Sequence, residues 1–268
     1  MDWKEQVKKR FSENGAAGRW SNIYSKEFSN VEAVSFRNRR DYTVNFIKDN
    51  VAAGSLVLDL GCGAGPVLKE LQPLDYSLVG VDYSPDMLQF AAENLDSSGK
   101  KIPLLRGECE KIPFPDNTFD CVVCLGVISY AESIDKALDE LHRVLKPGGV
   151  TIVSYRNKYN TICMDPVKLI KHVLTLPFTF FKPEKKVIGR SIPRSEVIAD
   201  IKNHPFVILK EKPIGFGKLR FAGKVVSDRK LAVKVNNGLD RVLTGLRLNF
   251  VYRAMADVHI FILKKPDL

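Results

Sequence analysis

The sequence predicts an α/β fold, built on a mostly parallel sheet with helices on both faces and inserted cap elements. Three observations support it. Short β-rich runs alternate with helical patterns from residue 51 to 155, a glycine loop follows the first run, and two long intervals interrupt this rhythm later in the chain. The 268 residues, 45% of them hydrophobic, suffice for one core of ordinary size. We therefore expect residues 1–268 to form a single domain with insertions.

Five β-rich runs predict the first strands of the sheet. Pro66 suits the first turn of a helix, because its missing N–H would have no helical partner there. The last helix of this region ends at Lys-Pro-Gly-Gly, a cation followed by helix breakers. The expected strands are 55–61, 77–83, 102–108, 119–127 and 148–155, and the expected helices lie near 66–73, 85–95 and 133–145.

The rest of the chain is expected to complete this core, about residues 51–155, and to cover it. A helix followed by a strand is expected over 193–212 and a last strand over 254–265, which brings the sheet to seven strands. Connections as long as those between these parts are usually functional in a compact domain. We interpret three segments as cap elements: 1–45, 156–192, and 213–253 with a helix near 229–246.

Charge is distributed unevenly along the chain. Residues 1–150 hold 18 Lys and Arg against 22 Asp and Glu, whereas residues 151–268 hold 23 against 9. The basic part is either a solvated surface or a surface for an anionic substrate, an acidic carrier protein or a negatively charged membrane. The start of the chain lacks an apolar signal-peptide stretch, and no run approaches the ~20 apolar residues that cross a bilayer. We expect a cytoplasmic protein.

The cysteines predict free thiols and no metal site. They lie at 62, 109, 121, 124 and 163, mostly within apolar or glycine-rich segments. Cys121 and Cys124 form a C-x-x-C, but this stretch reads as a buried strand, where residues three apart point to opposite faces. No second Cys or His pair at ligand spacing accompanies it.

The stretch VLDLGCGAG predicts a ligand site at the end of the first strand. Gly61, Gly63 and Gly65 permit conformations and close approaches that a Cβ would block, and Asp59 places a carboxylate beside them. A dinucleotide site would want G-x-G-x-x-G, and here a proline takes the sixth place. A P-loop is excluded because no G-K-[S/T] follows.

Two further acids extend this site to the neighbouring strands. Asp82 ends the second run, where a carboxylate accepts hydrogen bonds from both hydroxyls of a ribose. Glu108 ends the third run and is placed to accept a hydrogen bond from an adenine amino group. Three acids at successive strand ends would repel a pyrophosphate, so they predict a neutral or cationic nucleoside.

At this point the sequence resembles the class I S-adenosylmethionine-dependent methyltransferases, in particular the group that includes small-molecule and ubiquinone-type enzymes. The matching stretches are VLDLGCGAG, VGVDYSPDML, GECEKIPFPDNTFDCVVC and LHRVLKPGG, in the family's order and spacing. The resemblance covers about residues 55–155. It implies a Rossmann-like, seven-stranded, mostly parallel sheet with S-adenosyl-L-methionine as cofactor, and says almost nothing about the methyl acceptor.

The resemblance also implies roles for single residues. The glycine loop and Asp59 would approach the methionine part of the cofactor, and Asp82 would hold its ribose. Tyr24 and one arginine, which we take to be Arg37, would pair with the methionine carboxylate, unless this helix face is only solvated. The remaining expected contacts are Tyr83 and Met87 beside the adenine, Glu108 or the backbone of Cys109 at its amino group, and Leu125 and Gly126 under the sulfonium, with Cys62 in the loop. The family often has Asp where this chain has Glu108.

Candidate catalytic groups are few. Tyr130, just past the fourth strand, is placed either to hydrogen-bond the acceptor atom or to form a wall of the pocket. If a histidine acts as a base, our choice is His172 in the expected cap helix, whereas His259 is interpreted as a core histidine. Arg156 and Tyr159, just past the fifth strand, either orient an anionic group of the substrate or belong to a surface loop.

Three functional hypotheses remain. The first is a methyltransferase for O or N of a small molecule, such as a specialised metabolite, either anionic or carrier-bound. The second is a lipid or quinone-type methyltransferase at the membrane surface, with residues 167–186 as an interfacial segment. The third is a non-catalytic S-adenosylmethionine-binding regulator. We would expect a damaged cofactor loop in such a protein, so the intact DLGCGAG disfavours this hypothesis. Nucleic acid is an unlikely partner, because no recognition domain or aromatic RNA motif is present.

Overall fold

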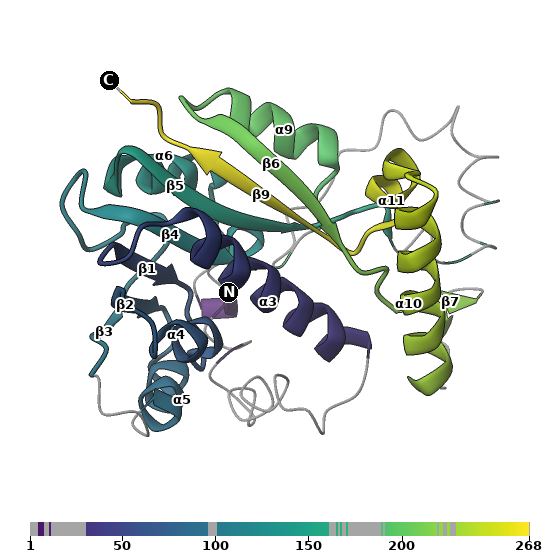
Figure 1. Ribbon diagram of the computed structural model, residues 1–268, viewed down its shortest axis with the longest axis horizontal. Coiled ribbons are helices and arrows are strands. Elements are labelled where there is room, and N and C mark those ends of the chain that lie inside the picture. Colours follow the sequence, from purple (N-terminus) through teal and green to yellow (C-terminus); the bar gives the residue numbers. More distant parts are fainter. Residues whose placement is uncertain are drawn as a thin grey trace.

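In the computed structural model, residues 5–7, 11, 31–95, 101–160, 165, 167, 170, 189, 191–218, 220, 221, 224, 225 and 229–267 are described. Seven strands of this part form one sheet in the order β3-β2-β1-β4-β5-β9-β6 (Figure 1). Six of them run parallel, and β9 is antiparallel to both of its neighbours. This confirms the expected seven-stranded, mostly parallel α/β sheet. The strands are β1 (Leu56–Leu60), β2 (Ser77–Asp82), β3 (Leu104–Arg106), β4 (Phe119–Leu125), β5 (Leu145–Arg156), β6 (Val207–Ile214) and β9 (Val258–Lys264).

Helices cover both faces of the sheet (Figure 1). On one face lie α6 (Ile134–Val144) and α9 (Arg194–Lys202), and on the other α3 (Val31–Asn50), α4 (Pro66–Leu71) and α5 (Pro85–Leu95). Successive strand residues point to opposite faces, so Leu58 packs with α6 and Val57 packs with α3 and α4. Both sides of β1 are therefore buried, which explains its continuous apolar run.

Local sequence explains where these elements begin and end. The Ser133 hydroxyl accepts a hydrogen bond from the backbone N–H of Lys136 and caps α6. That helix leads directly into β5, which begins three residues earlier than expected because Leu145 is already extended and pairs with Phe119. The third strand is shorter than expected and ends at Arg106, so Glu108 lies in the turn that follows it.

The described part of the expected cap at 213–253 is a helical hairpin beside the sheet. It contains α10 (Arg229–Gly245) and α11 (Asn249–Met255), preceded by β7 (Arg220–Phe221) and β8 (Lys224–Val225). Figure 1 shows the hairpin beyond the end of the sheet that carries the start of β9, next to α3. Most of the expected caps 1–45 and 156–192 lies outside the described residues, so their role as caps stays a prediction.

Buried asparagines join this hairpin to the sheet. Asn157, at the end of β5, donates from Nδ2 to the carbonyls of Ala254 and Ala256, at 3.0 and 2.9 Å. Asn160 donates from Nδ2 to the carbonyls of Phe216 and Met255, at 2.8 and 2.7 Å. Each buried amide thus satisfies two backbone carbonyls, and these hydrogen bonds tie the hairpin and the segment before it to the end of β5.

Candidate functional site

A cavity of about 230 Å³ lies beyond the carboxyl ends of the strands, with walls from the ends of β1, β2, β4 and β5 and from α3. The strand order reverses between β1 and β4, the place where open parallel sheets bind ligands. Twelve of the residues expected at the site line this cavity. They are Gly61, Cys62, Gly63, Asp82, Tyr83, Met87, Glu108, Cys109, Leu125, Gly126, Tyr130 and Arg156.

The loop after β1 needs its glycines for different reasons. All three have left-handed backbone, with φ of 71° at Gly61, 54° at Gly63 and 76° at Gly65. A Cβ at Gly61 would come within 2.1 Å of a methyl carbon of Val127, so this glycine permits close packing. A Cβ at Gly63 would meet no described atom within 4 Å, and Gly63 lines the cavity. Gly63 therefore keeps space open for a ligand, whereas Gly65 starts α4.

Asp82 holds this loop against the end of β2. Its Oδ2 accepts a hydrogen bond from the backbone N–H of Gly63 at 2.8 Å, and its Oδ1 accepts one from Ser84 at 2.9 Å. Burial raises the pKa of the Asp82 carboxyl, and the backbone hydrogen bonds from Ser84 and Gly63 oppose that rise. Asp82 also lines the cavity, where a carboxylate can accept a hydrogen bond from a ligand hydroxyl.

Asp59, in β1 just before the loop, is not part of the cavity wall. Its side chain is buried, and Oδ2 has no hydrogen-bond partner among the described residues. Burial, with a smaller contribution from the charge of Asp82, raises the pKa of Asp59 to about 7. The site can therefore take up a positive charge nearby by releasing the proton of Asp59.

The cavity lining after β2 and β3 has the residue types expected for the adenine pocket. Tyr83 and Met87 line the cavity here, and the Arg106 guanidinium lies 5.5 Å from the centroid of the Tyr83 ring. Cys109 also lines the cavity, and burial raises the pKa of its thiol to about 12, so the thiol stays neutral. Glu108 still reaches the cavity wall, although it lies in the turn after β3 and not in the strand.

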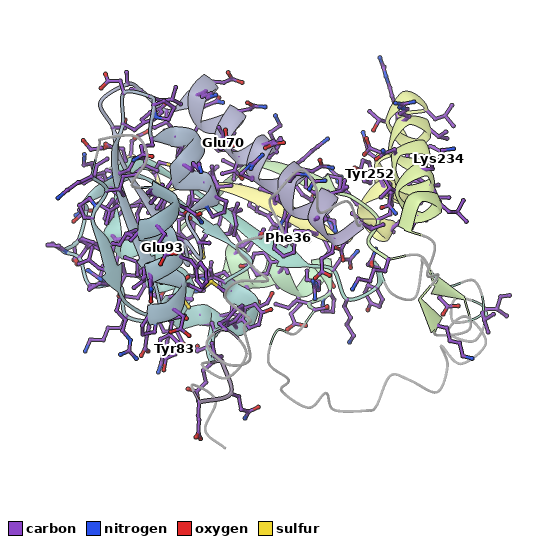
Figure 2. All side chains as sticks on the ribbon, turned by 90° about the horizontal axis from the view of Figure 1, so that it is seen from below. Phe36, Glu70, Tyr83, Glu93, Lys234 and Tyr252 are labelled. Atoms are coloured by element: carbon purple, nitrogen blue, oxygen red, sulfur yellow. The ribbon has the colours of Figure 1, made fainter. Side chains whose placement is uncertain are left out.

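The turn after β4 meets helix α3 at the cavity wall. The backbone N–H of Gly126 donates to the hydroxyl of the buried Ser154 at 2.8 Å. Arg39 of α3 lies against this turn, since a Cβ on Gly126 would be 3.3 Å from its Nη1. The Arg39 guanidinium also covers the ring of Phe36 at 4.1 Å, and Figure 2 shows Phe36 projecting from α3.

The arginine at the cavity is Arg39, whereas Arg37, the residue expected there, does not line it. The buried residues of α3 include Ser35, Arg39 and Thr43, four apart on one helix face, and Arg37 is two positions off this face. The burial of this face in the structure thus selects Arg39, and the weakly amphipathic sequence of the segment gives no clear signal for it. Sequence reasoning also missed Phe11, Phe36 and Ser154 as lining residues.

The expected catalytic and substrate residues are only partly brought together. Tyr130, in the short helix η2 (Ile128–Tyr130), lines the cavity, and its ring meets that of Phe11 edge-on at 5.0 Å between centroids. Arg156, at the end of β5, also lines the cavity. Tyr159 is 40% exposed and does not line it. Tyr24 and His172 lie outside the described residues.

The described residues offer little other catalytic chemistry. Among them, no group of three or more His, Cys, Asp or Glu side chains could hold a metal ion.

The structure describes four cysteines as free thiols: Cys62, Cys109, Cys121 and Cys124. Cys163 is outside the described residues. His259 is buried in β9, where its Nδ1 lies 2.9 Å from Glu211 Oε1, as expected for a core histidine. In the same part of the chain, no helix is long and apolar enough to cross a bilayer.

A family model described as "Methyltransferase domain" matches residues 58–153. The demethylmenaquinone methyltransferase of Staphylococcus epidermidis is 31% identical over 181 residues, which cover 66% of this chain and 71% of that protein. The sterol 4-C-methyltransferase strm-1 of Caenorhabditis elegans is 35% identical over 98 residues, 36% of this chain and 29% of that protein. The matched segment thus spans less than a third of the length of the sterol enzyme.

Solved structures share the fold. The magnesium protoporphyrin IX methyltransferase of Synechocystis PCC 6803, with bound SAH, aligns with a TM-score of 0.63 and 16% identity. The alignment covers 98% of this chain and 100% of that chain. At this identity, the likeness shows the fold alone and leaves the choice of acceptor open.

Proposed function

Because the chain belongs to the class I S-adenosylmethionine-dependent methyltransferases, we propose that it transfers a methyl group from S-adenosylmethionine to a small-molecule acceptor in the cavity. The observation that carries this proposal is that one cavity has two kinds of lining residue. We call the glycine loop with Asp82 the cofactor end of the lining, and the aromatic side chains of Phe11, Phe36 and Tyr130 the acceptor end.

The cofactor end fits a cationic nucleoside. Asp82 accepts hydrogen bonds from the ribose hydroxyls, Tyr83 and Met87 hold the adenine between them, and the turn after β3 reaches its amino group through Glu108 or the backbone of Cys109. Gly63 leaves space for the methionine part. We assign to Arg39 the pairing with the methionine carboxylate that sequence reasoning gave to Arg37, because Arg39 lies at the cavity and offers a bidentate fork.

The acidic residues at this end also match the positive charge of S-adenosylmethionine. When bound, S-adenosylmethionine supplies an electrophilic methyl group on a positively charged sulfonium. Asp59 and Asp82 lie close enough that the charge of Asp82 contributes to the raised pKa of Asp59. A cation above the loop favours ionisation of both carboxyls, whereas a pyrophosphate would be repelled by two acids, the buried Asp59 and the cavity-lining Asp82.

The residues of this chain then contribute to catalysis mainly by holding the cofactor and the acceptor in place. Leu125 and Gly126 support the reacting centre, and the apolar side chains around it keep water out while donor and acceptor are held at attack distance. The hydroxyl of Tyr130 hydrogen-bonds the acceptor atom and orients it. Amines and phenols react with little further help, so the acceptor atom we propose is an oxygen or nitrogen of this kind.

A second candidate is a lipid or quinone-type acceptor, including methylation on carbon. The cavity lining includes six apolar or aromatic side chains that suit an apolar ring or chain: Val7, Phe11, Phe36, Val127, Tyr130 and Val258. Relatives of the chain are named for demethylmenaquinone and for a sterol. In either case Arg156 is placed to hold an anionic or polar group of the substrate.

Methyl transfer from labelled S-adenosylmethionine tests this proposal. The purified chain is incubated with a fractionated extract and with a demethylated quinone, and the labelled product is identified by mass. We expect label in one small-molecule acceptor, and none with Asp82→Ala. Asp75→Asn, at an exposed carboxylate remote from the cavity, serves as the matched control. Binding of the cofactor without label in any acceptor would favour the regulator hypothesis instead.

A further inference from the structure

The helical hairpin of residues 229–253 exposes more apolar surface than its own core needs. Val242, Leu246 and Phe250 have exposed fractions of 54%, 65% and 75%, and Leu231 and Leu248 are also exposed. The hairpin already has a separate small core of four buried residues, namely Phe216, Leu243, Tyr252 and Ala256. The exposed side chains are therefore additional to the packing that holds the two helices together.

The exposed apolar side chains of α10 share one face of that helix, and further ones follow at the turn into α11. Leu231 and Val242 are eleven residues apart, about three helical turns, so they lie on the same face of α10. The backbone N–H of Leu246 donates to the carbonyl of Val242 at 2.9 Å, which continues the helical path by one turn. Leu248 and Phe250 follow directly at the start of α11. The result is an apolar stripe that ends at the turn between the helices.

Basic side chains border this stripe. Residues 229–253 contain six Lys or Arg and a single acid, Asp240, which accepts a hydrogen bond from the hydroxyl of Tyr252. Lys234 and Arg241 are exposed and seven residues apart, so they share a face next to the stripe. Figure 2 shows Lys234 on the side of α10 that is turned away from α3, and Tyr252 on the inner side. Arg247, exposed at the turn, lies between two exposed leucines.

The face is presented by a fixed element. Asn236 of α10 accepts a hydrogen bond from the backbone N–H of Phe216 at 2.9 Å and donates to the carbonyl of Gly217 at 3.1 Å. Lys218 pairs with Glu32 of α3 at 3.2 Å. Through these contacts the hairpin is joined to α3, the helix that brings Phe36 to the cavity.

We propose that this side of the hairpin docks on an anionic membrane surface, with Val242, Leu246 and Phe250 in the interfacial region and the cations at the lipid headgroups. Apolar anchors bordered by Lys and Arg are what such surfaces bind. A symmetric contact with a second copy would bring the cations of both copies together. A nucleic acid would match the charge and leave the apolar side chains in water. The proposal does not depend on methyl transfer.

Vesicle sedimentation of the full chain tests it, without cofactor or acceptor. One set of vesicles is pure phosphatidylcholine, and the other contains equal parts of phosphatidylcholine and phosphatidylglycerol. We expect binding to the anionic vesicles, weakened by salt. The double variant Leu246→Ser, Phe250→Ser should weaken it about tenfold or more. The double variant Lys234→Gln, Arg241→Gln should weaken it about 25-fold, since each charge contributes about fivefold.

Matched controls keep the test specific. Leu209→Ser on β6 removes an exposed apolar side chain, and Lys69→Gln on α4 removes an exposed charge, both away from the hairpin. Neither should change vesicle binding, and all variants should keep the thermal unfolding midpoint of the parent chain. Absence of binding to the anionic vesicles would overturn the proposal, as would binding that both double variants retain. Self-association in solution that Leu246→Ser, Phe250→Ser abolishes would assign the face to a second copy and also overturn it.

Discussion

The carboxylate of Asp82 accepts a hydrogen bond from the backbone N–H of Gly63 at 2.8 Å and so ties the loop after β1 to the end of β2. One carboxylate thereby shapes the loop and faces the cavity beside it. If the proposed ribose contact is correct, the same side chain links loop geometry to cofactor affinity. The first prediction follows from this double role.

Asp82→Ala should weaken the binding of both S-adenosylmethionine and S-adenosylhomocysteine. The loss of a charge-assisted hydrogen bond to ribose corresponds to about 1.5–3 kcal/mol, and calorimetric titration measures it. Both ligands should be affected alike, because they share the ribose. Asp75→Asn is the control, and affinity that stays the same in Asp82→Ala would falsify the ribose assignment.

Two glycines of the loop should respond differently to alanine. Both have left-handed backbone, so each variant carries about 1–2 kcal/mol of conformational cost. Gly61→Ala adds an overlap with Val127 and should lower the thermal unfolding midpoint further. Gly63→Ala places its Cβ in the open cavity, so it should keep more stability and lose cofactor affinity. A Gly63→Ala chain with unchanged affinity would speak against a ligand at this loop.

Cofactor binding should release a proton below neutral pH. The pKa of Asp59 is about 7 in the folded chain, raised by burial, and the carboxyl is therefore protonated at about pH 6. A bound cation lowers this pKa and expels the proton. Titrations in buffers of different ionisation enthalpy measure the release, which should vanish in Asp59→Asn and in the parent chain well above pH 8.

The same carboxyl predicts how folding stability depends on pH. The pKa of Asp59 rises from 3.8 to about 7 on folding, so between these values the folded chain binds more protons than the unfolded chain. The contribution of Asp59 to stability is therefore greatest below about pH 4 and falls as pH rises from there to about 7. Asp59→Asn should gain stability relative to the parent as pH rises from about 4 to about 8, with part of the gain already present at about pH 5, as measured by urea unfolding. A parent that gains stability relative to Asp59→Asn over this range would contradict the raised pKa.

The assignment of Arg39 gives a paired test. Arg39→Met should weaken the binding of S-adenosylmethionine about tenfold or more, because a bidentate pair with the methionine carboxylate is lost. Arg37→Met, two positions away and outside the cavity wall, should bind as the parent does. The reverse result would return the role to Arg37. Far-UV circular dichroism of both variants checks that α3 is intact.

Much of the sheet is predictable from sequence, because strands buried on both faces require apolar runs that few other structures use. The start of β5 was placed too late, since Lys-Pro-Gly-Gly reads as a helix end although the strand pairing already begins at Leu145. Tertiary pairing overrode the local signal there. The position of the glycine loop followed from the residues alone.

The site was predictable where it is local in sequence and less so elsewhere. The residues that follow each strand reach the cavity as expected, whereas Asp59, inside β1, is buried and does not line the cavity. Arg39 and Phe36 come from a helix whose place over the cavity is set by packing between segments far apart in sequence. The hydrogen bonds of the buried Asn157, Asn160 and Asn236 are likewise tertiary contacts, and no sequence spacing predicts them.

A crystal structure of the chain with S-adenosylhomocysteine is the most direct test of the central claim, that carboxylates at the strand ends grip a nucleoside cofactor in this cavity. We expect the ribose hydroxyls within hydrogen-bond distance of Asp82, the adenine between Tyr83 and Met87, and the sulfur next to Gly126. A ligand bound outside the cavity, or a ribose with no contact to Asp82, would contradict the account.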